Sequence, residues 1–264
     1  MTPVLTGTVA SVFYLSITAY LAYHLYVGKT VAKSLLLLPG VAALLLHLYV
    51  LYGIIFTPEG LAFGFFKIGS MFGWVIAALT IITSLYRPIE NLIIVAYPIA
   101  AISLWSSILV SSNTALISPA PSIIAHIIIS VLAYSILAIA VAQALLLAAQ
   151  NYQLKHKHTH GVLELLPPLQ TMETVLFEML WLGIGLLSIS IVTGVLFLDD
   201  IVAQHMIHKT VLSISAWVIF AVLLGGRHFL GWRGAIAIRW TLSGFFLLLL
   251  AYFGSKLVLE IILA

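Results

Sequence analysis

Residues 122–149 read SIIAHIIISVLAYSILAIAVAQALLLAA, a run without any Asp, Glu, Lys or Arg. A helix needs about 20 mainly apolar residues to cross the hydrocarbon core of a bilayer, so this run is long enough to span a membrane. Because hydrocarbon offers no partner to a free backbone amide or carbonyl, a spanning segment of this kind must be helical. The run therefore predicts a membrane helix with His126 about one turn from its start.

Other apolar segments of similar length lie on both sides of this run. The complete set of predicted spans is 4–26, 35–56, 66–85, 89–110, 122–149, 175–198, 208–227 and 239–263. With 63% hydrophobic and only 7% charged residues, the chain has too little polar surface for a soluble core. We therefore expect an all-α, polytopic membrane helix bundle with about eight transmembrane helices, forming one integral membrane domain over residues 1–264.

Positive charges are unequally divided between the two sides of this predicted bundle. One side holds Lys29, Lys33, Arg87, Lys155, Lys157, Arg227, Arg233 and Arg239, and the other holds Lys67, Lys209 and Lys256. Cytoplasmic loops keep the excess of Lys and Arg, so both termini are expected to face outward. The first apolar run has no basic residue before it and is as long as a full span, so it is expected to remain as a helix.

The amino-acid composition also limits which kinds of site and function the chain can have. The chain has no cysteine, which excludes thiolate metal sites, iron–sulfur ligation and a thiol-reducing role. Its net charge of +3 is small and spread over short loops, so nucleic-acid binding has no support. The spans lack a charged pathway, which ranks channel or transporter function low. Redox or metal chemistry in this chain must therefore use histidine.

Three histidines are placed to form a site near the outer surface. His126 opens the fifth predicted helix, and His205 and His208 open the seventh at the same expected depth. Neutral imidazole is a common axial ligand of haem iron, and two helices at one depth can supply a pair of such ligands. This placement predicts an outer haem site between the fifth and seventh helices.

A second set of candidates lies away from that level. His228 follows His208 by 20 positions, which is about 30 Å along a helix and places it at the inner surface. Arg227 and Arg233 beside it can pair with haem propionates, because guanidinium binds carboxylates in a bidentate manner. His47 is expected nearer the middle of the bilayer. These positions make His228 and His47 further haem-ligand candidates.

Simpler roles compete with each of these interpretations. A lone polar residue in a membrane helix often only hydrogen-bonds to a neighbouring helix. The tract of His156, His158 and His160 alternates at a strand period and would chelate a metal only if it were extended. Its solvated, lysine-flanked position favours an ordinary loop. On the residues alone, ligand and structural roles for the histidines both stay open.

The order of motifs in the second half of the chain resembles the cytochrome c assembly protein superfamily, the CcsA/CcmC-like membrane proteins that handle haem. The features that carry the resemblance are His126 with Tyr134, Thr193-Gly194, the segment from His208 to Trp217, Arg227-His228 with the following GWRG, and YFGSK at 252–256. The resemblance covers about residues 66–263. It implies an outer haem ligand at His126, an inner one at His228, and haem b as the cofactor.

Two departures refine the resemblance. No Trp lies between Gly194 and His208, where the synthetase members carry a tryptophan-rich segment, and residues 257–264 contain no histidine. The pattern is closest to the YpjD/HemX-like branch of bacterial inner membrane proteins. His205 or His208 can stand in for the missing second ligand, which is an inference from position and not a family property.

The resemblance implies a non-enzymatic protein of the bacterial cytoplasmic (inner) membrane that binds or traffics haem in cytochrome c biogenesis. Its expected partners are the lipid bilayer and other cytochrome c maturation proteins or apocytochrome. One alternative is a b-type haem subunit that transfers electrons across the membrane. Another is a cofactor-free membrane partner or regulatory protein of the HemX type, in which the histidines are structural.

Overall fold

The chain is helical almost throughout the part that the structure describes. The computed structural model describes residues 2–110, 119–156, 167–197 and 207–254. Its elements are α1 (Pro3–Val27), α2 (Lys33–Ile55), β1 (Phe56–Thr57), β2 (Gly60–Leu61), α3 (Phe65–Tyr86), η1 (Glu90–Leu92), α4 (Ile93–Leu109), α5 (Pro121–Lys155), α6 (Leu169–Phe197), α7 (Ile207–Leu230), α8 (Ala235–Leu249) and the π-helical turn η3 (Leu250–Gly254). Within these ranges, eight helices are long and apolar enough to cross a membrane, which confirms the predicted polytopic all-α bundle. The outward placement of both termini and the single domain stay predictions.

Helix ends follow local chemistry. At the start of α1, the Thr2 hydroxyl accepts a hydrogen bond from the Leu5 amide at 3.4 Å, and Pro3 occupies a first-turn position where its missing amide donor costs nothing. At its end, Gly28 adopts a left-handed conformation with φ of 74°. The first helix therefore begins and ends at residues suited to those positions.

Two helices extend furthest beyond their predicted spans. The fifth continues past residue 149 to Lys155, and the sixth begins at Leu169 instead of residue 175. Hydropathy marks only the portion that fits in hydrocarbon, whereas a helix continues until a breaker such as Pro167-Pro168 interrupts it. The eighth predicted span, 239–263, begins earlier, at Ala235, and its last part lies outside the described residues.

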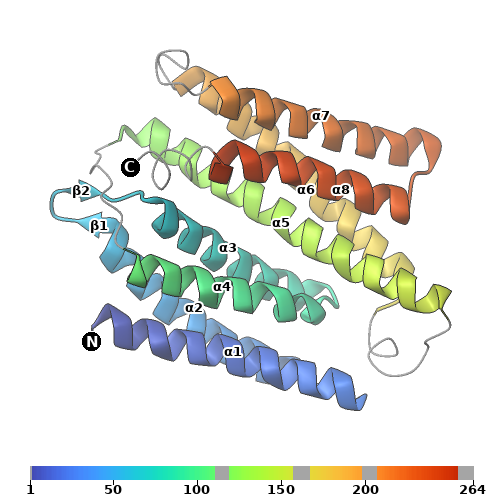
Figure 1. Cartoon of the computed structure of the whole chain (residues 1–264), viewed down its shortest axis with the longest axis horizontal. Coiled ribbons are helices and arrows are strands. Elements are labelled where there is room, and N and C mark those ends of the chain that lie inside the picture. The colour runs from blue at the N-terminus through green and yellow to red at the C-terminus, as the bar shows by residue number, and fades with distance from the viewer. Residues whose placement is uncertain (1, 111–118, 157–166, 198–206, 255–264) are drawn as a thin grey trace. The chain divides into compact units, whose positions relative to one another are not determined.

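Contacts divide the chain into two compact units, of which the first contains α1 to α4. In this unit α1 packs against α2 and α4, and α3 packs against the same two helices, so the four form a closed ring. Figure 1 shows these helices running side by side, with the short β1–β2 hairpin after α2. The ring encloses its own core, in which Tyr14, Leu36, Tyr97 and Leu104 are at most 1% exposed.

Small residues let the helices of this ring approach closely. A Cβ added at Gly73 on α3 would overlap the hydroxyl of Ser103 and lie 3.1 Å from the Cα of Ala100, both on α4. A Cβ added at Gly40 on α2 would overlap the hydroxyl of Tyr97. Association of helices in a membrane relies on such close packing, because lipid supplies no hydrophobic driving force between them.

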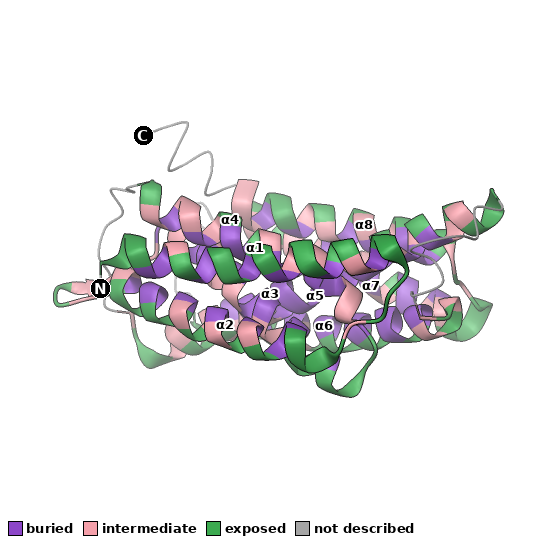
Figure 2. Cartoon of the chain, turned by 90° about the horizontal axis from the view of Figure 1, so that it is seen from below, coloured by how far each residue is buried: buried purple, intermediate pink, exposed green. Residues whose placement is uncertain are grey.

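The second unit contains α6, α7, α8 and most of α5. Here α7 packs against both α6 and α8, and α5 meets α6 where the Leu137 side chain lies against Gly183. Phe220 on α7 is fully buried and fills the space beside Gly244 on α8. In Figure 2 most helices carry a buried strip and an exposed strip, as expected for helices that face both protein and lipid.

We predict that Gly73→Ala separates α3 from α4. The added Cβ meets a backbone atom, which cannot rotate away, so we expect a loss of about 1–3 kcal/mol in the free energy of unfolding. Gly69→Ala on the same helix is the matched control, because no atom of the described residues lies within 4 Å of a Cβ built there. Thermal unfolding in detergent, followed by circular dichroism, measures both variants. Equal stability of the two variants would contradict the packing described above.

Candidate functional site

His126 lies against α6 near the start of α5. Its Nδ1 is 3.0 Å from the Thr193 hydroxyl oxygen, and a Cβ built on Gly194 would lie 3.0 Å from its Cε1. The missing side chain at Gly194 therefore provides the space in which the imidazole rests. The side chain of His126 is partly buried. Thr193 and Gly194 thus fix both the position and the tilt of the ring.

The hydrogen bonds of Thr193 determine which ring nitrogen of His126 carries the proton. The Thr193 hydroxyl donates to the backbone carbonyl of Ile189 at 2.8 Å, as hydroxyls in helices commonly do. Since its one proton is used there, the hydroxyl oxygen can only accept from His126. We assign the proton to Nδ1 on this basis, which leaves a lone pair on Nε2.

Ser130, one turn after His126, lies near that second nitrogen. Its hydroxyl donates to the His126 carbonyl at 2.7 Å, is 2.8 Å from the Ser190 hydroxyl, and is 3.4 Å from His126 Nε2. The last distance is long for a hydrogen bond, and the serine proton has a better acceptor. The Nε2 lone pair is therefore only weakly engaged by protein and can bind another group.

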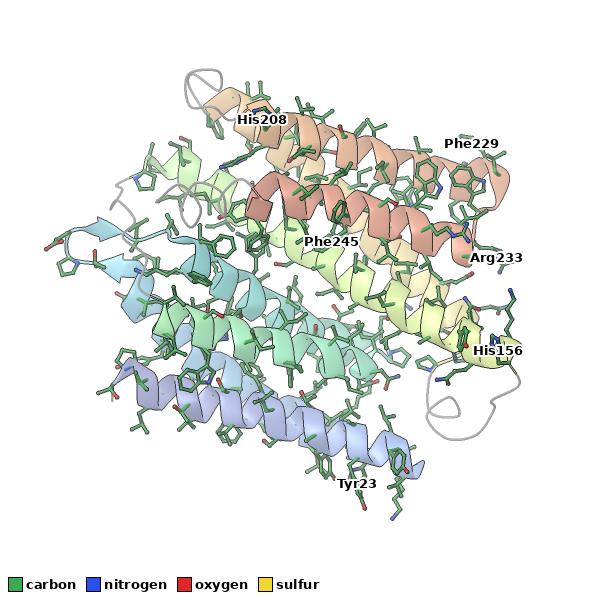
Figure 3. The ribbon with its side chains drawn as sticks, in the orientation of Figure 1. Tyr23, His156, His208, Phe229, Arg233 and Phe245 are labelled. Atoms are coloured by element: carbon green, nitrogen blue, oxygen red, sulfur yellow. The ribbon has the colours of Figure 1, made fainter. Side chains whose placement is uncertain are left out.

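Three histidines, His126, His205 and His208, are predicted near the outer surface. Only His126 has hydrogen-bond partners that the structure describes. His208 lies on the first turn of α7, where Figure 3 labels it, and its side chain is exposed. His205 lies outside the described residues. The hydrogen bonds described for His126 join it to α5 and α6. An additional ligand from His205 or His208 stays a prediction.

His228 lies at the other end of α7. It is exposed in the last turn, with its ring centre 4.8 Å from that of Phe229. Figure 3 shows His208 and Phe229 at opposite ends of the helix, in agreement with the predicted separation of the two levels. His228 is therefore accessible but is not enclosed by surrounding polar groups as His126 is.

Both arginines beside His228 have partners within the protein. Arg227 donates to the Trp232 carbonyl at 3.3 Å and lies 4.6 Å above the ring of Phe177. Arg233 Nε is 3.5 Å from a carboxylate oxygen of Glu173, and its side chain is 62% exposed. The guanidinium of Arg233 therefore keeps part of its donor capacity open to a carboxylate ligand, whereas Arg227 is held in the link between α7 and α8.

Sequence reasoning missed the importance of Glu173. This residue on α6 is only 6% exposed, and its carboxylate accepts from the backbone amide of Gly234 at 2.8 Å. Gly234 is the residue that precedes α8, so a carboxylate lies at the positive end of that helix, where negative charge is stabilised. The sequence did carry a signal for this role, because Glu173 is an acidic residue in a strongly apolar region.

His47 belongs to the first unit and lies in a different environment. Its side chain is fully buried, its Nε2 is 2.9 Å from the Ser70 hydroxyl, and the ring of Tyr14 approaches edge-on with ring centres 6.0 Å apart. An axial ligand needs open space beside its nitrogen for a macrocycle. The packing around His47 supports a structural role more than the predicted ligand role.

No ready-made metal cluster is present in the described ranges. Among those residues, no three His, Cys, Asp or Glu side chains converge as a metal site would require. A haem site needs only one or two protein ligands, because the porphyrin supplies four nitrogens to the iron. A single oriented histidine such as His126 can therefore provide the protein ligand that haem needs, but it cannot hold a bare metal ion alone.

Comparison with known proteins places the chain among membrane proteins of cytochrome assembly. The sequence profile of the family described as Cytochrome C assembly protein matches residues 35–263, so the matched region begins within α2 and not at about residue 66. Inner membrane protein YpjD of Escherichia coli (strain K12) is 38% identical over 142 residues, which is 54% of this chain and 54% of that protein. No solved structure matches the chain.

Two further relatives extend this comparison. A 28.8 kDa protein of Azospirillum brasilense is 32% identical over 140 residues, or 52% of each chain. Protein HemX of Brevibacillus brevis is 21% identical over 223 residues, covering 80% of this chain and 82% of that protein. The chain spans about half the length of the YpjD and Azospirillum relatives that it matches.

We predict that Glu173→Ala loosens the start of α8. Removing the buried acceptor leaves the Gly234 amide unpaired, which should lower the free energy of unfolding by about 1–3 kcal/mol. Glu173→Gln keeps a carbonyl oxygen and should lose less. Limited proteolysis between α7 and α8, together with thermal unfolding, separates these variants. Equal loss in both would mean that the charge of Glu173, and not its acceptor oxygen, is what stabilises this end of the helix.

Proposed function

Because the chain belongs to the cytochrome c assembly protein family, we propose that it binds haem b and passes it on during cytochrome c biogenesis. The eight membrane-spanning helices and the similarity to an inner membrane protein make it a multi-pass protein of the bacterial inner membrane, as expected from the sequence. In this proposal haem is cargo and the role is non-enzymatic. Its recipients are other cytochrome c maturation proteins or apocytochrome.

The observation that carries the proposal is the orientation of His126. Metal-ligating histidines usually donate their second ring N–H to a nearby oxygen, which fixes the tautomer and makes the ligating nitrogen more basic. Thr193 supplies such an oxygen at 3.0 Å, and Nε2 is the nitrogen left with a lone pair. The residues present therefore fit an axial haem ligand at His126.

Ser130 and Ser190 give the same nitrogen a second possible partner when haem is absent. The Ser130 hydroxyl is 3.4 Å from Nε2 and 2.8 Å from the Ser190 hydroxyl. A weak bond of this length costs little to give up when a ligand arrives. If Ser130 turns its proton from the His126 carbonyl to Nε2, it can weakly hydrogen-bond the unliganded histidine without competing strongly against iron. This suits a protein that must both take up and release haem.

The inner end of α7 offers a second level in this proposal. His228 is exposed there, and Arg233 retains exposed donor groups beside its contact with Glu173. An imidazole near a guanidinium matches the iron and the propionates of haem. His126 near the start of α5 and His228 in the last turn of α7 would thus form two levels, as transfer from one side of the membrane to the other requires.

We predict that His126→Ala removes the outer haem and that Thr193→Val weakens it. Loss of an oriented partner of a metal ligand typically costs about 10–100-fold in affinity, so Thr193→Val should need correspondingly more haem for half-saturation. Protein purified from haem-replete cells in mild detergent is measured by oxidised and reduced spectra and by the pyridine haemochrome assay.

His156→Ala is the matched control for these variants. His156 is exposed at the end of α5 and donates from Nδ1 to the Tyr152 carbonyl at 2.8 Å, so it shares the tautomer of His126 without its enclosed setting. Its haem content should equal that of the wild type. A folded wild type without haem would refute the proposal and favour the cofactor-free partner role.

We predict that His228→Ala changes the haem spectrum or stoichiometry independently of His126. His208, at the depth expected for His126, lies 20 positions or about 30 Å along α7 from His228. The two levels should therefore act independently, and the double variant should lose the sum of what each single variant loses. Haem titration of the four proteins, followed by absorbance, tests this additivity. An unchanged spectrum in His228→Ala, with His126→Ala losing all haem, would limit the protein to its outer site.

A further inference from the structure

The core of the first unit contains a cluster of polar side chains contributed by all four of its helices. Tyr14 comes from α1, His47 from α2, Ser70 from α3 and Tyr97 from α4, and each of them is 0% exposed. Apolar residues would fill such a core at a lower cost in desolvation. A polar cluster in the middle of a membrane bundle therefore requires a physical explanation.

Three atoms of this cluster have no hydrogen-bond partner among the residues that the structure describes. They are the hydroxyl oxygens of Tyr14 and Tyr97 and the Nδ1 of His47. The other nitrogen of His47 is satisfied, since Nε2 is 2.9 Å from the Ser70 hydroxyl. Buried polar atoms are almost always paired with protein or with ordered water, so three orphans in one cluster indicate a missing partner.

The three rings that carry these atoms are neighbours. The ring centre of Tyr14 is 6.0 Å from that of His47 and 5.1 Å from that of Tyr97. Gly40 on α2 leaves the space that the Tyr97 hydroxyl occupies, because a Cβ there would overlap it. The packing therefore brings a hydroxyl group into the core and holds it there.

We propose that this cluster is an internal binding site for water. A first water molecule accepts hydrogen bonds from the Tyr14 and Tyr97 hydroxyls and donates one to a second water, which donates to His47 Nδ1, while His47 Nε2–H donates to Ser70. Two linked molecules are needed because the Tyr97 hydroxyl lies beside Gly40, two helical turns along α2 from His47. This arrangement satisfies all three orphan atoms, and each water makes two or three hydrogen bonds, as buried waters typically do. The four members of the cluster include no Asp, Glu, Lys or Arg, so a neutral ligand fits it better than an ion.

The site is independent of the proposed haem function. It lies wholly in the first unit, and Tyr14 lies outside the range that the family profile matches. By joining α1, α2 and α4 through the water pair and α3 through Ser70, the bound water would hold a single register of the four helices. Hydrogen bonds between membrane helices add such specificity even where each contributes little stability.

A double-mutant cycle with Tyr14→Phe and Tyr97→Phe tests the proposal in the full chain. If both hydroxyls bind one water, each single change should lower the folding equilibrium constant about two- to tenfold, the range of one net hydrogen bond. The double variant should lose less than the product of the two, because the second hydroxyl binds a water already weakened by the first change. Reversible unfolding by sodium dodecyl sulfate in mixed micelles gives the constants.

The control is Tyr52→Phe, which removes a hydroxyl from a side chain on α2 that is 64% exposed and should be neutral. If Tyr14→Phe and Tyr97→Phe are neutral or stabilising and their effects multiply, the hydroxyls are true orphans and the proposal is wrong.

A second measurement does not depend on stability. Solid-state NMR in lipid bilayers, with labelled histidine and tyrosine, should transfer magnetisation from water protons to His47 and Tyr14. At His47 this transfer should disappear in the double variant, which has no tyrosine at position 14 to report. Its absence in the wild type, with transfer still seen at exposed His156, would also overturn the proposal.

Discussion

The absence of hydrogen-bonding partners in hydrocarbon is the constraint on which the rest of this structure depends. It forces each apolar run into a helix, and it favours a hydrogen-bond partner, on the same helix or a neighbouring one, for the polar side chains inside the bundle. The Trp217 indole illustrates the rule, since it donates to the Ser188 hydroxyl at 2.7 Å across α7 and α6. Trp74 does the same in the first unit by donating to the Leu44 carbonyl at 2.9 Å. Hydrogen bonds of polar residues therefore help to determine which helices pack together and in what register.

The same constraint acts differently on His126 and His47. His126 lies at the end of its helix, is partly buried, and keeps one nitrogen weakly engaged. His47 lies in the interior of a closed ring of helices and has no exposed surface. Both are single histidines in apolar spans, so residue type and hydropathy alone do not distinguish them. The identity of the facing residues, a Thr-Gly pair in one case and a Ser-Tyr pair in the other, makes the difference.

The sequence predicted the fold well because hydropathy and breaker residues act locally. All eight spans were identified, and the largest errors, at α5 and α6, arose where a helix continues beyond the hydrocarbon. The site was predicted only in part. His126 could be found from its position after a proline-rich breaker, whereas Ser190 and Glu173 act through contacts between residues about 60 positions apart. No local pattern encodes such contacts.

Gly194 beneath the imidazole of His126 has a consequence for how relatives of this chain can diverge. A side chain at that position would displace the ring, so His126, Thr193 and Gly194 should be gained or lost as a set during evolution. A relative that keeps the histidine but replaces the Thr-Gly pair would retain the residue without the geometry that orients it. All three residues, and not the histidine alone, should therefore be checked when asking whether a relative has an oriented histidine at this position.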